Sequence, residues 1–327
     1  MLTVAVPAYA WGTVGHRLVS RAGAEAFPAS LPAFVRTPTA IDEIAALGPE
    51  LDRSKGAGTS HDLDLDPGHY VDIDDSETIA GVVTLIALSS SRQAYEDALR
   101  GAHTDGYRMG YLPYALIDGW EQIAKDFAIW RIDAVGERMA VDARLRARFI
   151  ADRSLREALT LRDIGVWSHY VGDASQPLHT SIHFNGWGDA ANPDNFTTSH
   201  QTHAAFESSF VDQHATLASV RADMHPQATL SAPIAQLIGT YVLATHSNVI
   251  PFYRLEKAGA FAHATPEAVA FADARLAAGA CELRDLVVAA YDASATLPVG
   301  YPNGITPAQA ERGAAPVPLT IFGDTPE

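Results

Sequence analysis

"SLREALTLRDIGVWSHYVGD", residues 154–173, is the stretch of sequence that decides the fold. Leu155, Leu159 and Tyr170 recur on one stripe at helical spacing, so the stretch predicts a long amphipathic helix. His169 and Asp173 lie four residues apart on an adjoining stripe. Because residues four apart are neighbours on a helix surface, the predicted helix presents an imidazole and a carboxylate side by side near its end.

Helical character is not confined to this stretch. Further helices are predicted for residues 110–130, 231–250 and 265–294. Thr265 is placed to act as the N-cap of the last of these, with Pro266 in the first turn. Strand signals are sparse, and "HYVDID", residues 69–74, is the best candidate.

Two long segments contain many Gly, Pro, Asp, Asn and Ser residues, namely 48–78 and 180–202. They are predicted to be long ordered loops, which inside a compact domain are usually functional. Neither an internal repeat nor a dividing linker is found. The prediction is therefore an all-α fold, with one mainly helical domain over residues 11–296 and an extended Pro-rich tail over 297–327.

The composition limits the classes of partner. The chain has 327 residues, 47% of them hydrophobic, which is enough to bury a sizeable core. Its 23 basic and 39 acidic residues give a net charge of −16. Such a charge repels a polyanion at long range unless cations line the binding site. Bound divalent metal ions would supply positive charge locally.

The N-terminus favours export. Residues 1–10 are apolar and end in Ala8-Tyr9-Ala10, a small-x-small pattern typical of signal-peptidase cleavage, which would leave Trp11 as the first residue. The segment is short and lacks a basic n-region, so a plain apolar N-terminus is the alternative. With a signal peptide over 1–10, the protein is expected to be secreted or periplasmic. No apolar run is long enough to span a membrane, and a single cysteine, Cys281, excludes an intrachain disulfide.

Beyond the helical pair, further potential metal ligands follow in the chain. Pro177 ends the helix, so that His179 can turn back toward the same region. "HAAFE" then repeats the four-residue spacing with His203 and Glu207. Imidazole and carboxylate together suit zinc, and sites assembled from several elements tolerate loose spacing between pairs.

Upstream candidates form three pairs at short spacing. They are Trp11 with His16, Asp52 with Lys55, and His69 with Asp72. If cleavage exposes Trp11, its free amine and its carbonyl can chelate a metal together with His16. Taken alone, the Trp11 pair is an ordinary helix start, and each of the other two pairs is more simply a solvated loop. A lone His-x-x-x-Asp on a helix is likewise more often a capping pair, but two such pairs together with His179 favour a metal site. Three nearby histidines could contact the ligands from outside or lie on the surface, namely His183, His200 and His214, and His183 is expected not to be a ligand.

Taken in chain order, these residues resemble the zinc-dependent phospholipase C superfamily, which also contains the single-strand-specific zinc nucleases. Its members are mainly helical and hold three zinc ions with nine residues. Matching residue types occur in the same order at Trp11, His16, Asp52, His69, His169, Asp173, His179, His203 and Glu207. The most specific match is "HYVGDASQPLH", residues 169–179. Four other acidic residues compete for the place of Asp52, namely Asp42, Asp62, Asp64 and Asp66.

Two subfamilies match different parts of the chain. "WGTVGHRLV", residues 11–19, resembles the nucleases, and so do Asp-x-x-Lys at Asp52 and His-x-x-Asp at His69. The closing Glu207, within "NFTTSHQTHAAFESSFVD" at 195–212, resembles the bacterial phospholipases C. The Gly-Gly-Asn stretch of the nucleases is replaced by "TSIHFNG", residues 180–186, and the paired cysteines of the fungal and plant enzymes are absent.

The resemblance implies a trinuclear zinc site. Its three ions would be held by Asp52, His69, His169 and Asp173; by His179, His203 and Glu207; and by Trp11, His16 and the other oxygen of Asp173. A hydroxide between the first and third ions would attack phosphorus, and the second ion would bind the leaving oxygen. Asp52, Lys55 and Asp72 are the implied catalytic residues, because the nuclease lysine is thought to contact the phosphate and the aspartate to orient it.

The predicted function is a nuclease or 3′-nucleotidase that hydrolyses single-stranded nucleic acid, with no stable protein partner implied. The alternative is a phospholipase C that acts on phospholipid headgroups, and a different class is a non-catalytic helical metal-binding protein. A di-iron bundle fits poorly because it uses Glu-x-x-His. Four aromatic residues could stack a base or simply pack their loops, namely Tyr70, Phe184, Trp187 and Phe196.

Overall fold

The computed structural model describes residues 11–188, 190–313 and 317–323. Its α-helices are α1 (Thr13–Glu25), α2 (Pro38–Leu47), α3 (Thr59–Leu65), α4 (Arg92–Gly101), α5 (Gly106–Met109), α6 (Leu112–Met139), α7 (Ala143–Asp173), α8 (Thr202–Ala204), α9 (Val211–His214), α10 (Leu217–Asp223), α11 (Ile234–His246), α12 (Val249–Lys257), α13 (Pro266–Ser294) and α14 (Pro307–Glu311). Short 3₁₀ helices are η1 (Ala33–Arg36), η2 (Leu51–Ser54), η3 (Asp66–His69), η4 (Leu85–Ala87), η5 (Pro177–Thr180) and η7 (Leu319–Phe322). A π-helical turn, η6, spans Ala205–Phe210, and β1 (Thr78–Ile79) pairs with β2 (Val83–Thr84). The prediction of a mainly helical, single-domain fold is confirmed.

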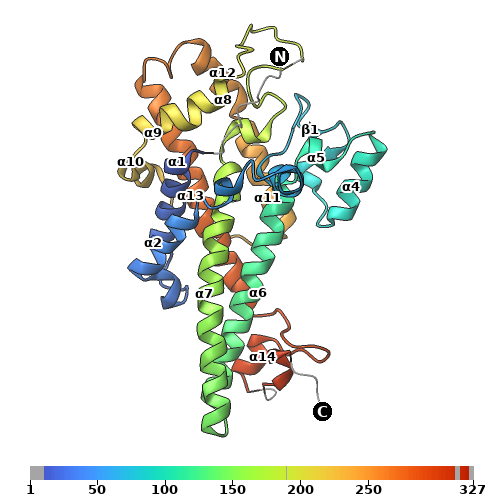
Figure 1. The fold of residues 1–327 in the computed structure, drawn as a ribbon, viewed down its shortest axis with the longest axis vertical. Helices are drawn as coiled ribbons and strands as arrows, with labels where there is room; N and C mark the ends of the chain where they lie inside the picture. Colours follow the sequence, from blue (N-terminus) through green and yellow to red (C-terminus); the bar gives the residue numbers. More distant parts are fainter. Residues whose placement is uncertain (1–10, 189, 314–316, 324–327) are drawn as a thin grey trace.

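The long axis of the molecule is an antiparallel pair of helices, α6 and α7 (Figure 1). Asp142 caps α7, since its carboxylate accepts the N–H of Leu145 at 2.8 Å. Trp167 of α7 lies against Gly119 of α6, where a Cβ would come within 2.0 Å of the indole ring, so only glycine allows this approach. The Trp167 indole also donates to the Leu116 carbonyl at 3.1 Å. The helix predicted for residues 154–173 is thus confirmed, and it begins eleven residues earlier.

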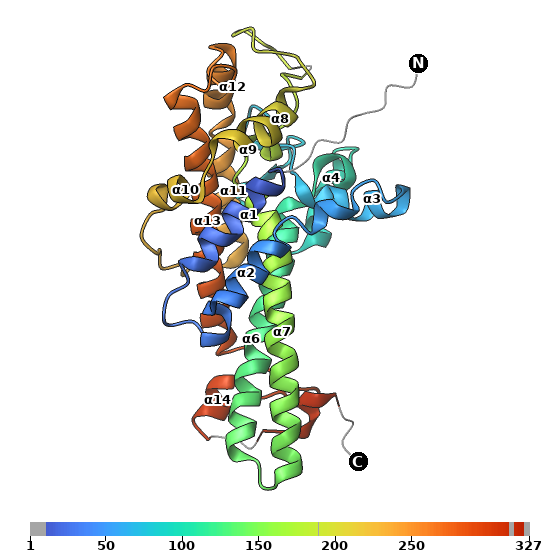
Figure 2. The ribbon, with the colours of Figure 1, turned by 60° about the vertical axis from the view of Figure 1, so that its left-hand side comes forward.

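The helix α13 runs beside this pair and, with α1 and α2, covers its flank (Figures 1 and 2). The predicted N-cap is confirmed, because the Thr265 hydroxyl accepts the N–H of Ala268. Gly23 of α1 allows close packing on α13, because a Cβ at this position would lie 2.9 Å from the Ala280 carbonyl oxygen. None of the helices in the described ranges is both long and apolar enough to cross a bilayer.

Two hydrophobic clusters meet at the end of α7. Val171 and Ala174 belong to the larger cluster, which α6, α7, α11 and α13 share. Leu178, only four residues later, belongs to the cluster around Trp11 and Phe206. The last turn of α7 and the segment after it are therefore held from both sides, which makes this region a rigid support for side chains.

Three details differ from the sequence-based expectations. The strand candidate 69–74 is wrong: η3 ends at His69, and within residues 69–74 only Ile73 forms an isolated bridge, with Ile79. The loop 48–78 contains the short helices η2, α3 and η3. The segment after residue 296 is not extended throughout, because α14 packs on α6, burying Val299 and Ile305 (Figure 2). The apolar side chains of this Pro-rich stretch pack against apolar residues of α6.

Candidate metal centre

Eight side chains converge around the end of α7, from seven separate elements. They are His16 of α1, Asp52 of η2, His69 of η3, His169 and Asp173 of α7, His179 of η5, and His203 and Glu207 of α8 and η6. All are buried except Asp52, which is partly exposed. They form three groups in which histidine nitrogens and carboxylate oxygens lie within 4.8 Å of one another. These groups could hold metal ions.

The first group consists of His16, His169 and Asp173. His16 Nε2 lies 3.5 Å from Asp173 Oδ1, and its ring stacks on that of His169 with centroids 3.7 Å apart. Gly172 makes room for this, since its Cβ position is 3.1 Å from His16 Nδ1. Nε2 of His169 lies 3.5 Å from the other oxygen of Asp173, so each stacked ring faces one oxygen of the same carboxylate.

The second group consists of Asp52, His69 and His169. His169 Nε2 lies 3.0 Å from His69 Nδ1 and 3.7 Å from Asp52 Oδ1. Asp173 Oδ2 also faces this group, at 3.0 Å from His69 Nδ1. The two oxygens of Asp173 thus face different groups, and His169 is common to both.

Asp52 has four competitors for its place in the ligand set, and its carboxylate does reach the cluster. Its Oδ2 lies 3.9 Å from His16 Nε2. Of the competitors, Asp42 pairs with Arg21 on the surface, and Asp62 accepts the N–H of Gly56. Asp66 lines the neighbouring cavity.

The third group consists of His179, His203 and Glu207. Glu207 Oε1 lies 3.0 Å from His179 Nε2 and 2.6 Å from His203 Nε2. The spacing His203–Glu207 crosses from α8 into the π-helical turn η6, a kind of distortion that occurs frequently at functional sites. Pro177 stops α7 and starts η5, which turns His179 toward Glu207 as predicted.

Gln176 is a member of this region that the sequence did not single out. Its side-chain amide donates to Glu207 Oε1 at 2.5 Å, while its oxygen accepts the N–H of Leu178 at 2.6 Å. The residue is fully buried. Its position just before the proline of "HYVGDASQPLH" was visible in the sequence, but a neutral amide beside ionisable residues gave no reason to select it.

Backbone carbonyls fix the orientation of three of the imidazoles. Nδ1 of His169 bonds the Gly48 carbonyl at 2.8 Å, and Nδ1 of His179 bonds the His69 carbonyl at 2.6 Å. His203 does the same with the Phe184 carbonyl at 2.8 Å. A carbonyl oxygen accepts and cannot donate, so the ring nitrogen that faces it, Nδ1, carries a proton, and Nε2 is the nitrogen that can offer a lone pair to a metal ion. Metal-binding histidines are held in this way.

Several buried polar atoms in the cluster have no hydrogen-bond partner. They are both ring nitrogens of His16, Oδ1 of Asp173 and Oε2 of Glu207. A buried polar atom without a partner costs about 1–3 kcal/mol, so a concentration of them needs an explanation. Coordination of metal ions satisfies imidazole nitrogens and carboxylate oxygens together. The residues present therefore fit a metal centre.

The protonation states of four of the histidines also agree with a metal centre. Burial lowers the pKa of His16 and His69 well below the usual value and lowers that of His169 to about 4. Burial also lowers the pKa of His179. These rings are consequently neutral at physiological pH, and neutral imidazole is the form that binds metals.

The carboxylates differ from each other. Burial raises the pKa of Asp173 well above its usual range, with nearby Lys55 opposing that effect. Burial acts in the same direction on Glu207, but His203 and His179 outweigh it and lower the pKa to about 2. Without positive charge beside it, Asp173 is thus an unfavourable place for an anion, and a divalent cation would reverse that.

A cavity of about 300 Å³ opens beside the cluster. It is lined by Lys55, Asp66, His69, Tyr70, Asp72, Arg108, Leu178, His179, Phe184 and His203. Lys55 Nζ pairs with Asp52 Oδ1 at 2.8 Å, and Asp52 raises the pKa of Lys55 against the effect of burial. Burial raises the pKa of Asp72 to about 7. The structure thus brings the predicted Lys55 and Asp72 to one cavity and joins Lys55 to Asp52.

The aromatic candidates divide into two pairs. Tyr70 and Phe184 line the cavity, and Phe184 is 47% exposed. Trp187 and Phe196 are buried and pack against Tyr253. They therefore pack the interior of their loop and do not line the cavity.

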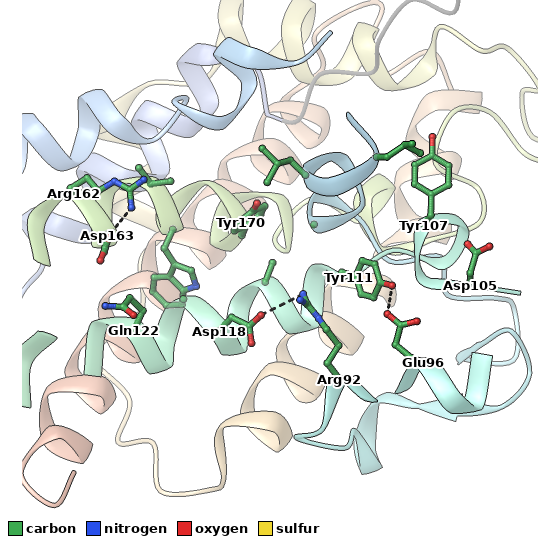
Figure 3. A pocket seen from close by; sticks show the side chains of 17 residues that line it. Arg92, Glu96, Asp105, Tyr107, Tyr111, Asp118, Gln122, Arg162, Asp163 and Tyr170 are labelled. Atoms are coloured by element: carbon green, nitrogen blue, oxygen red, sulfur yellow. Dashed lines mark hydrogen bonds and ion pairs between the residues drawn. The ribbon is translucent and has the colours of Figure 1, made fainter. Parts of the chain in front are cut away.

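A second, larger cavity of about 690 Å³ lies on the other side of η3, over the faces of α6 and α7 (Figure 3). Both of its arginines pair with carboxylates: Arg92 with Asp118 at 3.4 Å and Arg162 with Asp163 at 2.7 Å. It holds more carboxylates than guanidinium groups, and therefore does not offer a path for a phosphate backbone.

The remaining predicted residues have these positions. Trp11 is buried, and its indole donates to the Gly172 carbonyl at 2.8 Å, next to Asp173. Its role as a backbone ligand depends on cleavage after residue 10, and residues 1–10 lie outside the described part of the chain. His183 bonds Asp75 at 2.9 Å and stacks on Trp187. The three nearby histidines, His183, His200 and His214, belong to none of the three groups.

Comparisons with known proteins add no relative. No family model matches the chain. Neither the curated proteins nor the solved structures contain a match. The resemblance to the zinc-dependent phospholipases C and nucleases therefore rests on the ordered residues themselves.

Proposed function

We propose that this protein is a zinc-dependent phosphodiester hydrolase, acting as a nuclease or 3′-nucleotidase on single-stranded nucleic acid. The observation that carries the proposal is the convergence of three buried imidazole and carboxylate groups beside a cavity that contains a lysine. Phosphodiester hydrolysis requires a nucleophile, neutralisation of the phosphoryl charge and stabilisation of the leaving oxygen. A cluster of metal sites beside a cation can meet these needs together.

The ligand sets follow the three groups. Asp52, His69, His169 and Asp173 Oδ2 would hold one zinc ion; His16, Asp173 Oδ1 and the Trp11 backbone would hold another; His179, His203 and Glu207 would hold the third. The two oxygens of Asp173 support this division, because Oδ1 faces His16 and Oδ2 faces His69. Nε2 of His16 and Oδ1 of Asp173, which have no hydrogen-bond partner, would then each have a ligand bond.

The protein's own residues would bind and orient the substrate. Zinc ions bound at these sites would act as Lewis acids and make water a stronger nucleophile at neutral pH. Lys55, held by Asp52, would contact a phosphoryl oxygen, and Asp72 would orient the bound group from the cavity wall. Tyr70 and Phe184 offer rings on which a base could stack.

A phospholipase C is the second candidate, and one observation favours it. Large apolar side chains are exposed around the two cavities: Phe184 at the smaller one, and Leu63, Leu65 and Tyr107 at the larger one. Exposed apolar groups beside a site can contact a lipid surface. Single-stranded nucleic acid remains our first choice because the lysine and the stacking rings share the cavity with the cluster.

The deciding experiment assays the purified, N-terminally processed protein, loaded with zinc, against single-stranded DNA, RNA, 3′-nucleotides and phosphatidylcholine. Cleavage of nucleic acid or 3′-nucleotides that stops on chelation supports the proposal. Turnover of phosphatidylcholine without any cleavage of nucleic acid would reverse our preference. Binding of zinc without turnover of any substrate would indicate a non-catalytic metal-binding protein.

A further inference from the structure

Four cationic side chains line the two cavities that flank η3, and they differ in their partners. Lys55 pairs with Asp52. Arg92 and Arg162 pair with carboxylates of the larger cavity, as Figure 3 shows. Arg108, in the smaller cavity, is the only one of the four whose side chain has no carboxylate partner within the described part of the chain. Its charge is available to a ligand.

The backbone that carries Arg108 is tied to the segment that carries His69. Asp105 caps the short helix α5 by accepting the N–H of Arg108 at 3.0 Å. The carbonyl of Met109, the next residue, accepts the N–H of Asp72 at 2.8 Å. Gly110 then adopts a φ of 85°, where a Cβ would lie 1.9 Å from the Tyr70 carbonyl oxygen. Only glycine permits this contact, so Arg108 is held close to the metal-ligand segment.

We propose that Arg108 binds a second phosphate of the substrate, next to the one being hydrolysed, and thereby selects polymeric phosphodiesters. This inference rests on the proposed function. Lys55 and Arg108 line the same cavity of about 300 Å³, which is the size of a small-molecule site. Lys55 is already bound to Asp52 beside the metal groups. Arg108 therefore serves the neighbouring phosphate, where a guanidinium can donate two parallel hydrogen bonds.

The same charge acts against one alternative substrate. A phosphatidylcholine headgroup places a quaternary ammonium close to its phosphate, and Arg108 would repel it. An oligonucleotide instead places a phosphate on either side of each internal nucleotide. The acidic side chains of Asp66 and Asp72 line the same cavity and attract a cationic headgroup. Removal of Arg108 would therefore make the cavity more negative and favour phosphatidylcholine over an oligonucleotide.

The test compares Arg108→Ala with the wild-type protein, both loaded with zinc, on two substrates. One is a short oligothymidylate, and the other is the nitrophenyl ester of thymidylate, which has a single phosphodiester. We expect kcat/KM to fall on the order of tenfold on the oligothymidylate, the usual effect of one charged contact, and to stay within about twofold on the ester. Arg108→Lys should restore most of the loss, and Arg92→Ala, in the larger cavity, is the matched control.

Binding gives a readout that does not depend on turnover. Fluorescence anisotropy with a cleavage-resistant phosphorothioate oligothymidylate, measured against salt concentration, should show a slope smaller by about 0.7 in Arg108→Ala, because one fewer phosphate is neutralised. An unchanged slope, or an equal loss of activity on both substrates, would overturn the inference. If the wild type cleaves neither substrate, the proposed function fails, while the salt slope still decides whether Arg108 binds a phosphate.

Discussion

At the scale of single residues, the metal centre depends on which atom each side chain offers. Carbonyl groups hold Nδ1 of His169, His179 and His203, which leaves three Nε2 atoms directed at carboxylates. Such outer contacts are what fix the tautomer and the angle of a ligand. These outer contacts would hold the rings at the angles that coordination of a metal ion requires.

Asp173 is the residue on which we expect the centre to depend most. Asp173→Asn removes the charge while keeping the shape, and both neighbouring groups lose a carboxylate. We expect bound zinc to fall from about three ions per chain to about one, and kcat to fall by at least about a hundredfold. Elemental analysis measures the zinc content, and the nuclease assay measures kcat. Asp163→Asn, on the same helix outside the cluster, should change neither, and full zinc content in Asp173→Asn would contradict the site.

Gln176 tests the support of the third group. Gln176→Leu removes the amide that donates to Glu207 Oε1 while keeping a buried side chain of similar size. We expect the affinity for the zinc ion at this group to fall by about 10–100-fold. Competition with a chromogenic chelator measures the affinity. Gln122→Leu is the control, because Gln122 donates to the buried Asp126 away from the cluster. Equal zinc affinities in the two variants would show that Gln176 has no part in the group.

At the scale of elements, α6 and α7 bury acidic groups along their contact. Asp133 is fully buried, and neither of its oxygens has a hydrogen-bond partner. Burial, reinforced by Asp152, raises its pKa to about 8. In the unfolded chain an aspartate has a pKa of about 3.9. Between about pH 4 and pH 8, the Asp133 carboxyl is therefore protonated in the folded state and ionised in the unfolded state.

This difference has a definite sign. Where the folded state binds more protons, the free energy of unfolding decreases as pH rises, here between about pH 4 and pH 8. Asp133→Asn removes the titration, so its stability relative to wild type should improve by about 2 kcal/mol or more from about pH 5 to pH 8. Urea unfolding at both pH values measures it. Asp118→Asn, exposed on the same helix, should show the same change of unfolding free energy with pH as the wild type. If Asp133→Asn also shows that same change, Asp133 does not have a raised pKa in the folded protein.

At the scale of the whole molecule, the centre joins parts of the chain that are remote in sequence. His16 on α1 and Glu207 on η6 meet the end of α7 between two hydrophobic clusters. Metal ions bound there would connect these segments in the folded state only. Binding and stability are therefore linked.

Chelation should consequently destabilise the whole fold. A ligand present at a thousandfold excess over its Kd contributes about 4 kcal/mol, so we expect the thermal midpoint to fall on the order of 10 °C when zinc is removed. Differential scanning calorimetry with and without chelator measures it, and added zinc should restore the midpoint. An unchanged thermal midpoint after chelation would exclude a contribution of the metal to stability.

The N-terminus offers a separate test of the group that contains His16. A chain that retains residues before Trp11 carries an amide nitrogen there in place of an amine, and an amide is a much poorer ligand. We expect such a chain to bind about one zinc ion fewer than the processed protein, by elemental analysis. Equal zinc content in both forms would remove Trp11 from the ligand set.

The local features of this protein followed from the sequence alone. Helical periodicity predicted α7, and the four-residue spacing placed His169 beside Asp173, because both depend only on the geometry of one helix. Pro177 ended that helix for an equally local reason. The ordered set of histidines and acids likewise predicted which residues would gather, though not how.

Tertiary structure decided everything that depends on distance between segments. Only packing shows that His16 stacks on His169 and that Trp187 and Phe196 fill the interior. It also shows that Asp52, and none of its described competitors, belongs to one of the three groups of potential ligands. Gln176 and Arg108 belong to this category too, since their roles come from neighbours far along the chain. Sequence patterns report which face of one element is apolar; the partners across a cavity depend on how all elements pack together.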